Sequence, residues 1–163
     1  MEQYHILRRL QYLLTLLLLS IGLLHAVNPD SLTVARWNEN SILQGKLLYS
    51  DTDSAFIYAR RCLNIANRVG SEILIGKSHT QLGVLHFWKQ NFDSALVSYN
   101  KSIRLFRSLN DTGNTIRTKA NKANVFMYTR DFDSAVVIYL EVLDYFNSKN
   151  DTMNQANVNG TLG

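Results

Sequence analysis

The sequence predicts an all-α protein, specifically an α-solenoid of antiparallel helix pairs. One proline and eight glycines in the whole chain are too few for the many tight turns of a β-sandwich or barrel. The triplet Asp-Ser-Ala begins at Asp53, Asp93 and Asp133, and its three copies are equally spaced. Apolar residues after these triplets recur at three- and four-residue steps, as on the buried face of an amphipathic helix.

The first expected element is a targeting segment, residues 1–26. Arg8 and Arg9 precede an apolar run from Tyr12 to Leu24. As a helix this run spans roughly 20 Å, less than the ~30 Å hydrocarbon core of a bilayer, which favours a cleaved signal peptide over a permanent anchor. We predict cleavage after Ala26 and a linker over residues 27–35.

Residues 36–163 are predicted to form a repeat array. Its units cover about 36–70, 72–110 and 112–150, with a partial unit at 152–163. Aligning residues 88–115 with 128–155 gives twelve identities in 28 positions. A unit of about 40 residues accommodates two helices of about 17 residues and two turns of about three.

The second helix of each unit has the clearest pattern. Its expected stripes are Ala95, Leu96, Tyr99, Ile103 and Phe106 in one unit, and Ala135, Val136, Tyr139, Leu143 and Phe146 in the next. Asn91 and Asp131 are expected to cap these helices, and Asp111 or Asp151 the helices that follow. Gly70, Asn110 and Asn150 tolerate the left-handed backbone conformation and are expected to end helices.

The first helix of the unit at 112–150 is less regular. Ile116, Ala120, Ala123, Phe126 and Met127 lie near one stripe. Lys119 and Lys122, however, occupy positions where large apolar residues are expected. Their aliphatic stems can cover apolar surface while the ammonium groups reach water.

These residues resemble the tetratricopeptide repeat (TPR) family. The family pattern Trp-x2-Leu-Gly-x2-Tyr is approached by His79-x2-Leu82-Gly83-x2-His86, and Ala-x3-Phe by Ala95-x3-Tyr99. The resemblance covers about residues 36–163 and implies a right-handed superhelix, with His79 and His86 at large core positions. The 40-residue period is longer than the usual 34 and is similar to the lengthened repeats of bacterial exported sensor and regulator proteins. HEAT-like repeats are the alternative.

The resemblance also implies where a ligand binds. In such arrays the inner wall is lined by side chains of the first helix of each pair, and it receives peptides or partner helices. The expected contact residues are Lys77, Gln81, Val84, Trp88, Arg117, Asn121, Asn124 and Tyr128. A structural role is the alternative. In that case these residues form a solvated face, and the rings of Trp88 and Tyr128 cover the turn into the second helix of their unit.

Catalytic and metal-binding patterns are weak. Cys62 is the only cysteine, so neither an intrachain disulfide nor a Cys-x-x-Cys pair is possible. His79 and His86 share a helix face, but no carboxylate or cysteine lies one turn away, so we expect no metal site. We predict a non-catalytic protein without cofactors. The net charge is +4, but the basic residues are scattered along the chain, and we therefore expect no nucleic acid partner.

Two functions remain open. One is an exported scaffold that binds a protein or peptide, located in the bacterial periplasm or anchored in the inner membrane and facing the periplasm. The other is the extracytoplasmic sensor part of a longer signalling protein, such as a histidine kinase or transcriptional regulator. Leu162-Gly163 has the phase of Leu82-Gly83, which predicts that the chain stops within the first helix of a unit. We expect contact with a membrane only through residues 1–26, and only if this segment is not cleaved.

Overall fold

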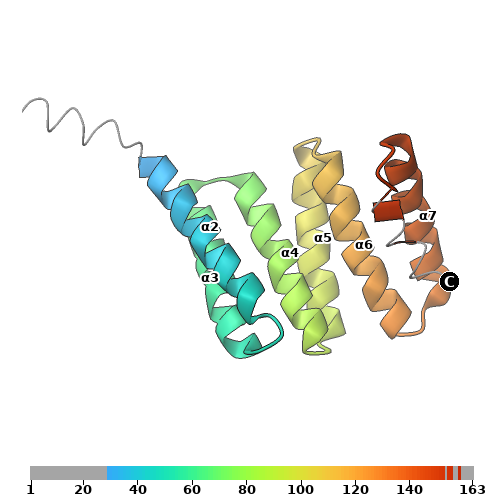
Figure 1. Ribbon diagram of the computed structural model, residues 1–163, viewed down its shortest axis with the longest axis horizontal. Helices are drawn as coiled ribbons and strands as arrows, with labels where there is room; N and C mark the ends of the chain where they lie inside the picture. The colour runs from blue at the N-terminus through green and yellow to red at the C-terminus, as the bar shows by residue number, and fades with distance from the viewer. Residues whose placement is uncertain (1–28, 153, 156–157, 159–163) are drawn as a thin grey trace, which may run out of the picture. The chain divides into compact units, whose positions relative to one another are not determined.

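The computed structural model describes residues 29–152, 154, 155 and 158. The predicted signal peptide and the Leu162-Gly163 pair lie outside these residues. Within them the structure is helical and contains no strand, which confirms the all-α prediction. The helices are α2 (Pro29–Leu47), α3 (Thr52–Val69), α4 (Glu72–Trp88), α5 (Phe92–Ser108), α6 (Thr112–Tyr128) and α7 (Phe132–Ser148) (Figure 1). Further helical residues follow from Thr152.

Helix α2 begins at Pro29, so residues 29–35 of the predicted linker are helical. Proline suits the first turn of a helix because its fixed φ is helical and its missing N–H would have no partner there. The chain forms two compact units, Met1–Arg36 and Trp37–Gly163. All contacts described below lie within the second unit. None of the described helices is long and apolar enough to cross a membrane.

The turns after α3 recur at equal intervals and have one common geometry. Each contains one residue with positive φ, and each closes through a 6→1 hydrogen bond, in which the backbone N–H of residue 71, 91, 111, 131 or 151 donates to the carbonyl five positions earlier. Gly70, Asn110 and Asn150 take the left-handed conformation as predicted. Gln90 and Arg130 do so as well, although neither residue type favours it. The turn within a helix pair and the turn between pairs therefore have the same geometry.

Most of the described helices begin with a side-chain cap. The side chains of Asp51, Asp111 and Asp131 accept a hydrogen bond from the backbone N–H three positions later. Asn91 occupies the same position but makes no side-chain capping bond. Hydrogen bonding by the side chain and the backbone N–H of Ser54 lowers the pKa of Asp51 below the ordinary carboxyl value, and hydrogen bonding by the backbone N–H and the side chain of Asn114 does the same for Asp111.

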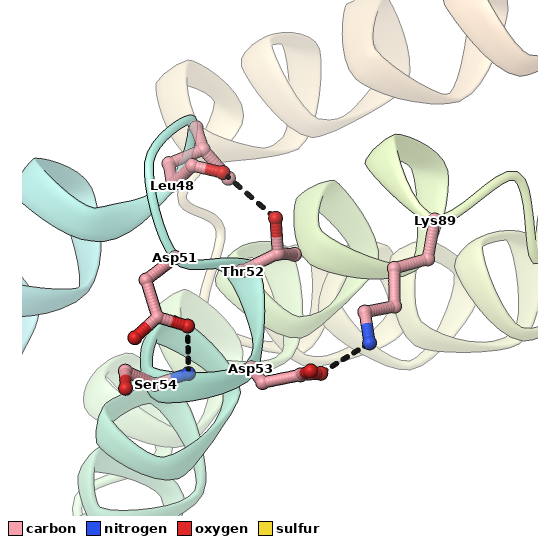
Figure 2. A network of polar contacts seen from close by, with 6 residues as sticks. All are labelled: Leu48, Asp51, Thr52, Asp53, Ser54 and Lys89. Carbon is pink, nitrogen blue, oxygen red and sulfur yellow. Dashed lines mark hydrogen bonds and ion pairs between the residues drawn. The ribbon is translucent and has the colours of Figure 1, made fainter.

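The recurring Asp-Ser-Ala triplet lies just after the cap, and Figure 2 shows Asp53 and Ser54 of its first copy. The Ser54 backbone N–H donates to Asp51, the Thr52 hydroxyl donates to the Leu48 carbonyl at 3.2 Å, and Asp53 forms an ion pair with Lys89. Ala55, like Ala95 and Ala135, is fully buried. The triplet therefore combines a favourable charge in the first helical turn with a small residue at a helix contact.

Consecutive helices from α3 to α7 pack against one another, and α4 also contacts α6. We call α2, α4 and α6 the A helices, and α3, α5 and α7 the B helices. A Cβ atom at Gly83 of α4 would lie 2.5 Å from a ring carbon of Tyr99 on α5, and one at Gly76 would lie 2.9 Å from the Phe106 ring. Glycine is required where an aromatic ring of the B helix lies directly on the A helix backbone.

The A helices are buried on two sides. In α4 the buried residues include Gly76 and Gly83, which face α5, and Leu85, which packs with Ala55 and Ala59 of α3. The corresponding residues of α6, 40 positions later, are also buried. His79 and His86, which the resemblance places at large core positions, are half-buried. A helix enclosed from both sides has no single apolar stripe from which its core can be predicted.

Hydrogen bonds between polar side chains connect the A helices. The Trp37 indole N–H donates to Ser78 Oγ at 3.0 Å. The Thr80 hydroxyl lies 2.7 Å from that of Ser102 and 3.1 Å from that of Thr118, which joins α4, α5 and α6. Because Ser78, Ser102 and Thr118 are almost fully buried, these bonds require one specific alignment of the helices.

We expect Gly83→Ala to destabilise the protein. Tyr99 is 1% exposed and its ring has no room to move, so the added methyl group overpacks the contact at a cost of about 1–3 kcal/mol. This exceeds the ~1 kcal/mol that alanine gains over glycine within a helix. Gly45→Ala is the matched control, because nothing lies within 4 Å of its added Cβ, and it should be stabilising by about 1 kcal/mol. Chemical denaturation measures both, and equal effects would contradict the assigned contact.

Candidate functional site

The predicted contact residues lie on two A helices at equivalent positions. Lys77, Gln81, Val84 and Trp88 belong to α4, and their counterparts one repeat later, Arg117, Asn121, Asn124 and Tyr128, belong to α6. Positions three and four apart share one side of a helix. The two sets therefore follow corresponding sides of α4 and α6.

Three of these residues meet in one hollow of about 250 Å³. Arg117, Asn121 and Asn124 line it from α6, together with Ala120. The opposite wall comes from α7 and from the helical residues after Thr152. The residues of that wall are Tyr139, Phe146, Asn154 and Val158. The hollow thus combines one guanidinium group and three amides with an aromatic and aliphatic floor.

Hydrogen bonds orient the amides of the hollow. The Tyr139 hydroxyl donates to Asn124 Oδ1, and burial raises the pKa of Tyr139, so the phenol keeps its proton. This bond leaves the Asn124 Nδ2 group as a donor. Asn154 donates through Nδ2 to Asp151 at 2.7 Å, which leaves its carbonyl oxygen as an acceptor. The two asparagines therefore present complementary hydrogen-bonding groups.

Arg117 supplies positive charge beside the hollow. Its side chain is exposed, and within the described part of the chain it forms no ion pair. Hydrogen bonds from Asn154 lower the pKa of Asp151, and the nearby Arg117 lowers it further. Lys77 and Arg117 make a similar, smaller contribution to the lowered pKa of Asp111. Both carboxylates already cap their own helices, so the guanidinium group remains able to bind another anion.

The remaining predicted residues lie elsewhere. Lys77 is exposed on α4, and Val84 packs against the buried cluster of Ala95, Tyr99 and Val125. Gln81 donates through Nε2 to the Ser41 hydroxyl, whereas its buried Oε1 has no partner among the described residues. Gln81 thus links α4 to Ser41 of α2.

Trp88 and Tyr128 belong to an aromatic cluster at the ends of α4 and α6. Trp88 makes an edge-to-face contact with Tyr49, and Tyr128 makes one with Phe87, both with ring centroids 4.9 Å apart. The ring centroid of Phe92 lies 6.4 Å from that of Tyr128. Even so, Trp88 is 48% and Tyr128 68% exposed. The rings cover the turns, as in the structural alternative, but retain accessible surface.

Sequence reasoning missed half of the hollow. It predicts Tyr139 and Phe146 only as core residues of a second helix, and both are indeed buried, at 2% and 4% exposed, yet they also line the hollow. Asn154 and Val158 belong to a helix predicted only as a partial unit. The repeat register could have indicated Asn154, because it corresponds to Asn114, which binds the cap Asp111 in the same way as Asn154 binds Asp151.

The two histidines of α4 are not part of the hollow. Burial lowers the pKa of both below 6.5, with smaller contributions from Lys101 at His79 and from Arg60 at His86. The His86 ring makes an edge contact with Phe56 at 5.0 Å. Among the described residues, no group of three or more His, Cys, Asp and Glu side chains is placed to hold a metal ion.

No protein-family model matches this chain, and no curated protein matches it significantly. The inference of function therefore depends on the hollow and on the helix arrangement around it.

We expect stability to fall as the pH decreases from about 7.5 to 5. In the unfolded chain His79 and His86 take up protons near their ordinary pKa of 6.5, whereas in the folded chain they do so only at lower pH. Protonation therefore favours unfolding in this range, and the contribution of the neutral histidines is lost below pH 6.5. The capping carboxylates Asp51 and Asp111 titrate below 3.8, outside the range. Thermal unfolding of the double variant His79→Gln, His86→Gln should show a flatter pH dependence, and an unchanged dependence would contradict this assignment.

Proposed function

We propose that this protein is a non-catalytic scaffold of TPR-like repeats that binds a peptide or a protein segment on its A helices. The observation that carries the proposal is the hollow lined by Arg117, Asn121 and Asn124. Its amides can pair with the N–H and C=O groups of an extended backbone, and its guanidinium group can bind a carboxylate.

The arrangement of the helices supports the resemblance to TPR proteins. The A helix glycine at position 83 lies against the B helix aromatic residue Tyr99, as the family pattern implies. Helices α4 to α7 each have 17 residues and alternate through short turns. In such stacks, side chains rather than backbone groups form the binding surface, because every helix already satisfies its own backbone hydrogen bonds.

The proposal includes export through the N-terminal segment. Arg8 and Arg9 followed by the apolar run from Tyr12 to Leu24 support it. We propose the bacterial periplasm as the location of the repeat array, because the lengthened repeat resembles those of exported bacterial proteins. Amino-terminal sequencing of the secreted protein tests this, and a mature chain that retains residues 1–26 would contradict cleavage.

We expect Arg117→Ala and Asn124→Ala to weaken peptide binding. A charge-assisted hydrogen bond contributes about 1.5–3 kcal/mol, so the loss of Arg117 should weaken binding about ten- to hundredfold. A neutral hydrogen bond contributes about 0.5–1.5 kcal/mol, so Asn124→Ala should have a smaller effect, about two- to tenfold. An array of peptides ending in acidic residues supplies the ligands, and fluorescence anisotropy measures the affinities.

Lys101→Ala is the control, because Lys101 is an exposed residue of α5 outside the hollow. Circular dichroism should show the same helicity in all three variants. Peptides that bind with unchanged affinity to both hollow variants would exclude this face as the binding site.

A further inference from the structure

A second hollow lies on the other side of α6. It has a volume of about 220 Å³ and is formed by α5, α6 and α7. An adjoining hollow of about 300 Å³ shares Arg107, Lys119 and Glu141 with it. At about 100° per residue, Lys119 and Lys122 project from the side of α6 opposite to Arg117, Asn121 and Asn124. The two hollows are therefore separate surfaces. The residues lining the second one are Asn100, Ile103, Arg104, Arg107, Lys119, Lys122, Ile138 and Glu141.

The second hollow gathers four cations and one carboxylate. Glu141 forms an ion pair with Lys119, whose side chain is only 12% exposed. Within the part of the chain that the structure describes, no carboxylate pairs with Arg104, Arg107 or Lys122. Burial and the neighbouring charges of Lys119 and Arg107 lower the pKa of Lys122. The three cations without an ion pair thus repel one another and Lys119, because the one carboxylate that lines the hollow, Glu141, already pairs with Lys119.

The repeat itself does not require this charge. One repeat earlier, Leu82 and His79 stand at the positions of Lys122 and Lys119. In the repeats before and after, Asn67 and Asn147 stand at the position of Arg107. An apolar or neutral side chain therefore fits the same place in neighbouring units. Basic residues at these positions decrease stability unless a ligand neutralises them.

We propose that this hollow binds a multiply charged oxyanion of the phosphate class. Arg104 and Arg107 lie three positions apart on α5, so both guanidinium groups can reach one anion. Each provides a planar fork of N–H donors that matches two phosphate oxygens, and Lys122 adds a third positive charge from α6. Asn100 offers a neutral donor at the same rim. The anion can come from a free phosphate or from a phosphorylated side chain of a partner.

The test compares the full chain with the double variant Arg107→Asn, Lys122→Leu. Both replacements are the residue types found at the same position of a neighbouring repeat, so the variant should fold, and circular dichroism verifies this. Arg68→Ala is the control, since it removes one exposed arginine from α3, outside this hollow. Thermal unfolding is measured in sodium pyrophosphate and in sodium chloride at the same ionic strength, and calorimetry measures the affinity for pyrophosphate.

Pyrophosphate should raise the midpoint temperature of the wild type and of Arg68→Ala, but not that of the double variant. The double variant should have the higher midpoint in sodium chloride, because the repulsion is removed. Its affinity for pyrophosphate should be at least about tenfold lower, since two charge-assisted contacts are lost. Equal responses of the wild type and the double variant would overturn the proposal.

Two further arms identify the source of the anion. Stronger binding of a phosphoserine peptide than of pyrophosphate, lost in the double variant, would support the site and assign it to a modified partner. Stronger binding of pyrophosphate would support it and assign it to a free ligand. Binding of duplex DNA with no response to pyrophosphate or to the phosphopeptide would overturn it in favour of a nucleic acid surface.

Discussion

The close contact between aromatic rings of the B helices and the backbone of the A helices determines the spacing on which the rest of this structure depends. Tyr99 lies on Gly83 and Phe106 on Gly76, so α4 and α5 approach at two points along their length. In the next pair, Ile116 and Ala123 occupy the corresponding positions of α6 and are also buried. At Gly76 and Gly83 an added Cβ would overlap a ring of α5, so a larger side chain there requires that ring or its helix to shift. The spacing in turn decides which polar groups meet, including the hydroxyl groups of Thr80, Ser102 and Thr118.

Helix α6 separates two surfaces of different chemistry. One side presents amides and a single guanidinium group next to Tyr139 and Phe146. The other presents Lys119 and Lys122 towards two arginines of α5. A helix that contacts neighbours on both flanks holds both sets in place without any loop. Binding on one side therefore need not rearrange the other, and each set can be altered by substitution without changing the packing between the helices.

Much of the fold was predictable because the repeat amplifies weak signals. The regular recurrence of Asp-Ser-Ala, the caps at Asp111 and Asp131 and the stops at Asn110 and Asn150 follow from residue types with strong local preferences. The left-handed turns at Gln90 and Arg130 could not be predicted in that way, since only the closure of the turn requires them. Val136 was expected in a buried stripe, yet it is 40% exposed, whereas Val142 is buried. The A helices, which are enclosed from both flanks, have no single periodic pattern of apolar residues.

The candidate site was predictable only in part for a related reason. The A helix positions of Arg117, Asn121 and Asn124 follow from the repeat register, and the structure places these three side chains in one hollow. The opposing residues Tyr139 and Asn154 come from other helices, so only the packing brings them there. The cations of the second hollow are scattered in the sequence, because Arg104 and Lys122 belong to different helices. Antiparallel pairing of α5 with α6 brings them together.

The uniform turns have a consequence for how such a chain can grow. Since the left-handed residues recur at 70, 90, 110, 130 and 150, each described helix from α4 onward leaves its predecessor by the same route. Duplication of the coding sequence for one helix pair adds one A helix and one B helix. The new turns are then like those already present. Duplication of a single helix with its turn keeps the same turn geometry but places a B helix at the position of an A helix. An aromatic ring would then face another aromatic ring instead of a glycine. Lengthening by recombination is thus restricted to whole pairs.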